Sequence, residues 1–190
     1  MDQPQRSGIV AVFGSSTLQE HDPAYAEVQR LGAELAGRGL AVMTGGYDGA
    51  MAAASRGARD AGGHVIGVTV DLFESRGAVN RWVNERVHTP DLYERLRHLA
   101  READAFVAVT GSIGTLTELF LAWTLVAVGV RPGVPLVLMG AHWRPWLEAH
   151  REPGFIPEHL FRHVEIADTP EATARLIAER LAARAAGAAS

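Results

Sequence analysis

Nine consecutive residues, 110–118, carry the groups best suited to chemistry. They read Thr-Gly-Ser-Ile-Gly-Thr-Leu-Thr-Glu and stand between a strand-like apolar run, 105–109, and a helix-like run, 114–128. A strand that turns through glycines into a helix commonly seats a phosphate, because small residues let the backbone approach an anion and the first N–H groups of the helix point at it. Glu118 falls in the first turn of the predicted helix. The spacing therefore predicts chemistry on a phosphorylated small molecule, with one carboxylate beside the anion.

Glu118 also has an interpretation that needs no ligand. An acidic residue near a helix N-terminus offsets the helix dipole, which stabilises the fold by roughly 0.3–1 kcal/mol. The catalytic interpretation gains support because apolar residues of the same helix are expected to bury one side and leave its N-terminal turn facing a crevice. Those apolar residues are Leu116, Leu119, Phe120 and Trp123.

Arg95 is the second candidate for chemistry. It lies in a predicted helix, 91–103, at about 60° from Leu92 and therefore at the margin of the apolar stripe. That stripe consists of Leu92, Leu96, Leu99, Ala100 and Ala103. Two interpretations stay open for an arginine at such a margin. It can cover apolar surface with its stem and pair with a carboxylate, or it can reach a ligand in a crevice formed by neighbouring loops.

Strand-like and helix-like patterns alternate along the rest of the chain. The expected strands are 9–13, 40–44, 64–70, 85–88, 105–109, 135–139 and 164–167, and the expected helices are 22–38, 50–61, 91–103, 114–128, 143–150 and 169–184. This alternation predicts an α/β fold, a single Rossmann-like domain over residues 1–190 with a parallel sheet and helices on both faces. Residues 1–7 and 185–190 are expected to be flexible. The irregular segment 71–84 is expected to cover the site or to cross to a partner subunit.

Two further glycine turns follow predicted strands, one after 9–13 and one after 40–44. Each alone is explained by a tight turn or by a serine that caps a helix. Together they indicate a shared crevice, because ligands of open parallel sheets bind at the carboxyl ends of the strands. The predicted phosphate- or nucleotide-binding residues are Gly14, Ser15, Ser16, Gly45, Gly46, Gly111, Ser112, Ile113, Gly114 and Thr115.

The composition excludes several classes of function. A net charge of -4 argues against a surface for nucleic acid or for an anionic membrane. No apolar run approaches the roughly 18 residues of a membrane-spanning helix, and the polar first residues lack the apolar core of a signal peptide, so we expect a cytoplasmic protein. The eight histidines fit no zinc spacing, and without cysteine no thiolate can bind a metal. We therefore expect neither a metal nor a cofactor.

Lysine is also absent, since all 18 basic residues are arginine. Without a lysine amine the chain can form no Schiff base with pyridoxal phosphate or with a carbonyl substrate. It can form no Walker A loop either, because that loop needs a lysine that reaches the phosphates. Any bound anion must be held by arginine, by hydroxyl groups or by backbone N–H groups.

Arg95 with its helix, strand 105–109 and the Gly-x-x-Gly-Thr-x-x-Glu pattern over 111–118 resemble the LOG family. That family includes cytokinin riboside 5'-monophosphate phosphoribohydrolases that were long labelled lysine decarboxylases. The resemblance extends to 13–16 and 45–51 and covers most of the chain to about residue 129. It implies hydrolysis of the N-glycosidic bond of a nucleoside 5'-monophosphate, of the AMP or cytokinin riboside monophosphate type, to free base and ribose 5-phosphate. It also implies catalytic roles for Arg95 and Glu118, a phosphate seat on residues 111–115, and a homodimer with the site near the interface.

This chain departs from the family pattern at three positions. The family reads Pro-Gly-Gly-x-Gly-Thr-x-x-Glu where this chain has Thr110 and Ser112, and the Arg-Lys pair of the family is Arg95-Leu96 here. Ser112 adds a Cβ where the backbone approaches phosphate or needs a positive φ, and Leu96 removes a cation. These departures keep a second function open, that of a noncatalytic nucleotide- or molybdenum-cofactor-binding carrier on the same fold.

Overall fold

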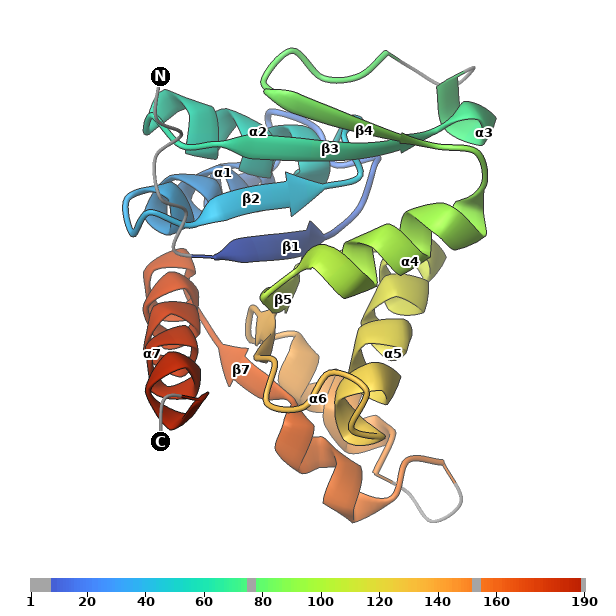
Figure 1. Cartoon of the computed structure of the whole chain (residues 1–190), viewed down its shortest axis with the longest axis vertical. Coiled ribbons are helices and arrows are strands. Elements are labelled where there is room, and N and C mark those ends of the chain that lie inside the picture. The colour runs from blue at the N-terminus through green and yellow to red at the C-terminus, as the bar shows by residue number, and fades with distance from the viewer. Residues whose placement is uncertain (1–7, 75–77, 152–154, 189–190) are drawn as a thin grey trace.

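A seven-stranded parallel sheet forms the centre of the protein (Figure 1). The structure is a computed structural model that describes residues 8–74, 78–151 and 155–188. The strands lie in the order β4-β3-β2-β1-β5-β6-β7, which confirms the predicted α/β fold. Their bounds are β1 Ile9–Phe13, β2 Ala41–Thr44, β3 Val65–Val70, β4 Glu85–Thr89, β5 Ala105–Ala108, β6 Leu136–Met139 and β7 Glu165–Ala167.

Helices cover both faces of the sheet, as predicted, and a separate hydrophobic core lies under each layer. Side chains of β1 alternate between the two cores, with Val10 and Val12 in one and Ala11 and Phe13 in the other. In Figure 1, α4 and α5 lie in front of the sheet and α1 and α2 behind it. The layer with α1 holds α1 Pro23–Ala36, α2 Ala50–Asp60 and α7 Pro170–Ala188; the other holds α4 Leu92–Glu102, α5 Ile113–Ala127 and α6 Trp143–Ala149.

Capping residues set where the helices begin. Asp91 is the N-cap of α4, and its carboxylate accepts a hydrogen bond of 2.8 Å from the backbone N–H of Glu94. The Thr169 hydroxyl accepts one of 3.2 Å from the N–H of Ala172 at the start of α7. Helix α7 continues to Ala188, beyond its predicted end near residue 184, and the flexibility of residues 185–190 stays a prediction. Of the predicted flexible ends, residues 1–7 and 189–190 lie outside the described residues.

Two short helices were not predicted. Asp71–Glu74 forms α3, so the first residues of segment 71–84 are helical rather than irregular, and Glu158–His163 forms a 3-10 helix, η1. A helix of four residues makes one turn, which is too short for a 3.6-residue apolar period to show in the sequence. A 3-10 helix has a period of three and gives no such signal either.

The strand order places the predicted turns together. The sheet reverses its direction of growth between β1 and β5, which pair in parallel with Phe13 beside Ala108. In such sheets the connections from the two central strands leave toward opposite faces and open a crevice at the carboxyl ends. Hydrogen bonds join the turns across this point: Ser15 N donates to Thr110 O (3.0 Å), and Ala50 N donates to Ser15 O (2.7 Å). The glycine turns after β1, β2 and β5 are therefore neighbours in space.

Candidate functional site

Arg95 is buried at the carboxyl edge of the sheet, with only 5% of its surface exposed. Its Nε donates to Val68 O (2.9 Å), and its Nη1 donates to Glu118 Oε1 (3.2 Å). The guanidinium thus connects β3 to α5. The sequence placed Arg95 at the margin of the buried face, and the structure places it inside. Gly45 makes this burial possible, because a Cβ on that residue would overlap Arg95 Nη2 and lie 2.6 Å from Met51 Sδ.

The apolar stripe predicted on α4 is correct only in its second half. Leu99, Ala100 and Ala103 are buried, whereas Leu92 is 37% exposed and Leu96 is half-buried. Leu96 lines a surface groove between α4 and α5 instead of the core. The structure therefore agrees that Leu96 makes apolar contacts, and it shows that these contacts are at the surface.

Glu118 is the sixth residue of α5, because the helix begins at Ile113 rather than near Gly114. The first turn of α5 holds no acidic residue, so the helix-dipole interpretation of Glu118 is wrong. Its side chain is 13% exposed and pairs with Arg95, whose side chain is 6% exposed. Burial raises the pKa of the Glu118 carboxyl, while the charge and the hydrogen bond of Arg95 act in the opposite direction. A buried carboxylate whose pKa is raised is a stronger base than an exposed one.

The raised pKa of Glu118 predicts how stability varies with pH. The folded protein binds the Glu118 proton more tightly than the unfolded chain, so the stabilisation from this group is full below the ordinary pKa of 4.5 and is lost as pH rises through the folded pKa. We expect the unfolding free energy of the wild type to fall over this range relative to that of Glu118→Gln, which does not titrate there. Urea unfolding of both proteins at a series of pH values measures the difference. Parallel pH profiles for the two proteins would contradict the prediction.

The turn between β5 and α5 presents backbone donors that the helix itself does not use. The first helical hydrogen bond of α5 runs from Leu116 N to Ser112 O (3.0 Å), so the N–H groups of residues 113–115 precede it. Ser112 is the N-cap residue, but its side chain makes no capping hydrogen bond. Its φ of -113° is ordinary, so the serine at this family glycine position causes no backbone strain. Ile113 is 79% exposed beside these donors.

Thr115 is buried under this turn and packs directly against Gly111. A Cβ on Gly111 would lie 2.7 Å from Thr115 Cγ2 and would overlap the hydroxyl oxygen as well. Gly111 therefore keeps the turn tight around the Thr115 side chain. Gly114 differs, because no heavy atom lies within 4 Å of the position its Cβ would occupy, and its φ is not positive. Packing therefore explains Gly111, whereas neither packing nor conformation explains Gly114.

The other two predicted turns are shaped by close packing. A Cβ on Gly14 would lie 2.5 Å from Ala50 Cβ and 2.6 Å from Val109 Cγ2. Gly46 has a φ of +80° and its Cβ position is 3.2 Å from Gly67 Cα. The Ser15 hydroxyl lies 2.9 Å from that of Thr17, and Ser16 is exposed. These contacts give Gly14 and Gly46 structural reasons for being glycine, and binding by this set of residues stays a prediction.

Sequence reasoning missed two side chains that hold the site together. Asn80 is buried, its N–H donates to Gly46 O (2.9 Å), and its Nδ2 donates to Tyr47 O (3.0 Å). Phe73 lies against Tyr47 and against the guanidinium of Arg95. Both residues fall in segment 71–84, which carries no periodic pattern, so neither could be identified from the sequence. Of the residues in this cluster, only their common neighbour Tyr47 lies in a glycine motif.

Within residues 8–74, 78–151 and 155–188, no group of three or more histidine or carboxylate side chains is arranged to hold a metal ion. Over these ranges no helix has the length and apolar character needed to cross a bilayer. The expectation that the protein uses no metal or cofactor stays a prediction.

Comparisons with known proteins agree on one family. The family model described as possible lysine decarboxylase matches residues 51–177. A cytokinin riboside 5'-monophosphate phosphoribohydrolase of Mycobacterium tuberculosis is 31% identical over 156 residues, covering 77% of this chain and 83% of that protein. The enzyme of the same name from Mycobacterium marinum is 30% identical over 176 residues, covering 88% and 91%. A solved molybdenum cofactor binding protein from Rippkaea orientalis has a TM-score of 0.71 and 25% identity, covering 91% of this chain and 96% of that one.

The matched region contains Arg95, Glu118 and the whole turn between β5 and α5. The absence of lysine excludes a pyridoxal-lysine enzyme, although it does not itself test lysine as the substrate that the old family name implies. The resemblance seen in the sequence is confirmed by a family model that covers more than half of the chain and by a relative 31% identical. This chain belongs to the LOG family, whose model bears the description possible lysine decarboxylase.

Proposed function

We propose that this protein hydrolyses the N-glycosidic bond of a nucleoside 5'-monophosphate, AMP or a cytokinin riboside monophosphate, to free base and ribose 5-phosphate. The observation that carries the proposal is the buried ion pair of Arg95 and Glu118 beside a helix N-terminus with open N–H groups. The relatives from two Mycobacterium species are named for this reaction. The predicted cytoplasmic location is part of the same proposal.

The geometry supplies each part that the reaction needs. The 5'-phosphate binds the N–H groups of residues 113–115, where the helix dipole favours an anion. Glu118 faces the ribose, and its carboxylate accepts a proton from the attacking water and stabilises the positive charge that develops on the sugar. The water oxygen bonds to C1', the bond from C1' to nitrogen breaks, and its electron pair leaves with the base, which then takes up a proton. Arg95 holds Glu118 in place and keeps its charge paired until the transition state forms.

The carrier function is the second candidate, and the fold similarity to the molybdenum cofactor binding protein favours it. A carrier needs the anion seat but has no need for a buried carboxylate held by an arginine. Glu118 and Arg95 therefore favour the enzyme. Turnover separates the two functions: an enzyme releases product, and a carrier retains its ligand unchanged.

The proposed function is tested by chromatography of the products. Purified protein is incubated with AMP and with the other common nucleoside monophosphates, and free base and ribose 5-phosphate are quantified over time. Release of both products in equal amounts supports the phosphoribohydrolase. AMP that binds without any product from any monophosphate would support the carrier instead.

Gly114 gives a test of the phosphate seat that is independent of the catalytic pair. Nothing in the folded protein requires a glycine here, so we expect Gly114→Ala to raise the unfolding free energy by up to about 1 kcal/mol. The added methyl group stands among the N–H groups that are proposed to bind the phosphate. The KM for AMP should therefore rise about tenfold, which is the effect expected from the loss of one charge-assisted hydrogen bond. Gly187→Ala, in open space near the end of α7, is the matched control and should leave KM unchanged. An unchanged KM in Gly114→Ala would place the phosphate elsewhere.

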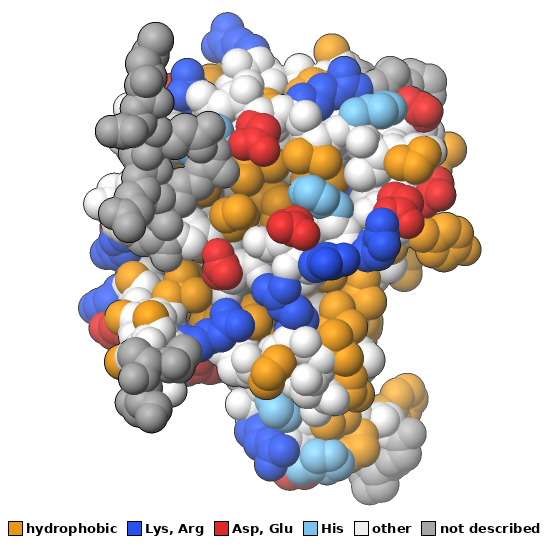
Figure 2. Space-filling model, in the orientation of Figure 1, with side chains coloured by type: hydrophobic (Ala, Val, Ile, Leu, Met, Phe, Trp, Pro, Cys, Tyr) orange, Lys and Arg blue, Asp and Glu red, His pale blue; other side chains and the backbone are white. Residues whose placement is uncertain are grey.

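A homodimer is the second part of the proposal, and α5 carries the argument. This helix is apolar around most of its circumference, yet the sheet buries only one side of it. A helix of that kind is normally buried all round. On the surface, an apolar stripe runs along α5 beside several arginines (Figure 2). We infer that a second copy of the chain covers it.

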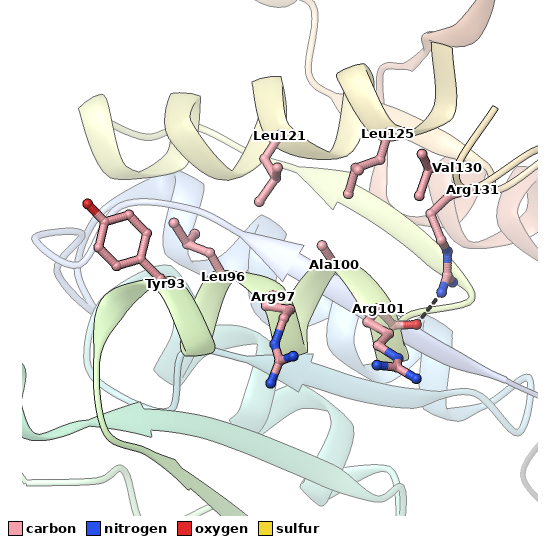
Figure 3. Close-up of a pocket in the computed structure, with 9 residues that line it drawn as sticks. All are labelled: Tyr93, Leu96, Arg97, Ala100, Arg101, Leu121, Leu125, Val130 and Arg131. Atoms are coloured by element: carbon pink, nitrogen blue, oxygen red, sulfur yellow. Dashed lines mark hydrogen bonds between the residues drawn. The ribbon is translucent and has the colours of Figure 1, made fainter. Parts of the chain in front are cut away.

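The centre of this surface is a groove of about 470 Å³ between α4 and α5. Leu121 and Leu125 of α5 point toward Leu96 and Ala100 of α4, while the guanidinium groups of Arg97 and Arg101 extend away from the apolar floor (Figure 3). Tyr93, 84% exposed at one end of the groove, is two residues from Arg95. An interface here would therefore lie next to the candidate site.

Charge in the groove should separate the subunits. The wild type is expected to sediment at twice the chain mass of 20.4 kDa, and Leu125→Arg at the mass of one chain, because an unpaired guanidinium in an apolar interface is costly to desolvate. Ala182→Arg on the exposed side of α7 is the matched control and should leave the dimer intact. A wild-type protein that sediments as a monomer at micromolar concentration would contradict this interface.

A further inference from the structure

Phe73 is an aromatic side chain in contact with Arg95 of the catalytic pair, and it packs against Tyr47 in the turn after β2. The Tyr47 hydroxyl donates to Val70 O (2.9 Å) and accepts from Val70 N (3.0 Å), so it fastens the last residue of β3. Helix α3 begins at the next residue, beyond the end of β3 (Figure 1). The Phe73 ring then packs edge-on against the Tyr47 ring, with centroids 5.9 Å apart and an interplanar angle of 82°.

The other neighbour of Phe73 is Arg95. The guanidinium carbon lies 5.7 Å from the centroid of the Phe73 ring, within the range of a cation–π contact. The same guanidinium donates to Glu118, so one arginine separates the aromatic ring from the carboxylate. Phe73 itself is half-buried.

The order of the strands indicates how the nucleotide would lie along the carboxyl edge of the sheet. The anion seat follows β5, and Phe73 follows β3; two strands, β2 and β1, lie between them. Three inter-strand spacings amount to about 14 Å, a distance that a phosphate, a ribose and a base laid end to end can span. With the phosphate on α5 and C1' at Glu118, the base lies on the β3 side of the ion pair.

We propose that the Phe73 ring forms the wall on which the base of the nucleotide stacks, and that it gives the site its preference for purines. This inference rests on the proposed function for the placement of the nucleotide. Aromatic rings accept every base by its face, and the larger face of a purine gains more than that of a pyrimidine. The contact with Arg95 couples the wall to the catalytic pair, since a base on Phe73 is held beside the residue that orients Glu118.

Calorimetric titrations with AMP, CMP and ribose 5-phosphate test the wall. The titrations are made in a Glu118→Gln background, so that bound nucleotide is not consumed. Phe73→Ala should raise the Kd of AMP about tenfold, the size expected for loss of one stacked base, and the Kd of CMP by less. The Kd of ribose 5-phosphate, which has no base, should stay within twofold and serves as an internal control for the phosphate seat and for Arg95.

Two further variants separate stacking from packing. Phe73→Tyr keeps the ring, so its Kd for AMP should equal that of the Glu118→Gln protein with Phe73 intact. Phe73→Leu keeps apolar contact with Tyr47 but loses the ring, so its Kd for AMP should rise. Full AMP affinity in Phe73→Leu or Phe73→Ala, or an equal loss for AMP and ribose 5-phosphate, would overturn the proposal. A wild type that binds AMP but releases no base would overturn the proposed reaction and would leave the Phe73 test valid.

Discussion

Release of base from AMP by Glu118→Gln is expected to fall about a thousandfold, the size of a lost catalytic base or of a lost electrostatic contact to the transition state. The carboxylate is the group that takes the proton of the attacking water and faces the positive charge on the ribose. The amide that replaces it has nearly the same shape, and its oxygen still accepts the hydrogen bond from Arg95 Nη1. The fold and AMP binding should therefore persist while kcat falls. Single-turnover assays with AMP measure the loss, and calorimetry measures the retained binding.

The control for this result is Glu179→Gln in α7. Glu179 is exposed and forms a surface pair of 3.8 Å with Arg175, an arrangement worth little stability. The same loss of one charge should leave the turnover of AMP unchanged there. Turnover by Glu118→Gln at the wild-type rate would remove Glu118 from the mechanism and leave the ion pair as a structural feature of the crevice.

The fold was largely predictable from local patterns. All seven strands were expected. The five inner strands appear as short apolar runs because helices cover both of their faces, whereas the edge strand β4 is mostly polar and exposed. The start of α7 followed from its capping residue Thr169, whereas the N-cap of α4 is Asp91, which was expected to be the first residue of the helix. The sequence could not reveal α3 and η1, because four and six residues are too few for a helical apolar period to repeat along the chain. Helix α7 extends beyond its predicted end near residue 184 because its last residues are mostly alanine, the strongest helix former.

The candidate site was predictable in its members and not in their geometry. Glycines after strands indicated the turns, and the fixed edge of a parallel sheet indicated that they would meet. The burial of Arg95 depends on space left by Gly45, a residue 50 positions earlier, and no pattern within α4 contains that information. Glu118 was placed in the first turn of its helix, but counted from either the predicted start at Gly114 or the observed start at Ile113 it lies in the second turn. Phe73 was missed because its position is set by contacts with Tyr47 and Arg95 across the fold.

Gly45→Ala is expected to cost about 3 kcal/mol of unfolding free energy and about a hundredfold in kcat/KM, although the change adds one methyl group. The new Cβ would overlap Arg95 Nη2. An exposed arginine would move aside at little cost, but Arg95 is held by Val68 O and Glu118 and has 5% of its surface exposed. Its displacement breaks both contacts and leaves the Glu118 carboxylate buried without its partner. Urea unfolding and the AMP assay measure the two losses.

A double-mutant cycle identifies the cause of that loss. If the overlap with the guanidinium is responsible, Gly45→Ala should cost less than about 1 kcal/mol when it is made in an Arg95→Ala background, because the group it displaces is gone. A cost that is the same in both backgrounds would assign the clash to Met51, whose Sδ would lie 2.6 Å from the new Cβ. The cycle also separates two explanations of this glycine. A glycine that lets the backbone approach phosphate affects binding whether or not Arg95 is present, whereas a glycine that makes room for Arg95 affects the protein only through that arginine.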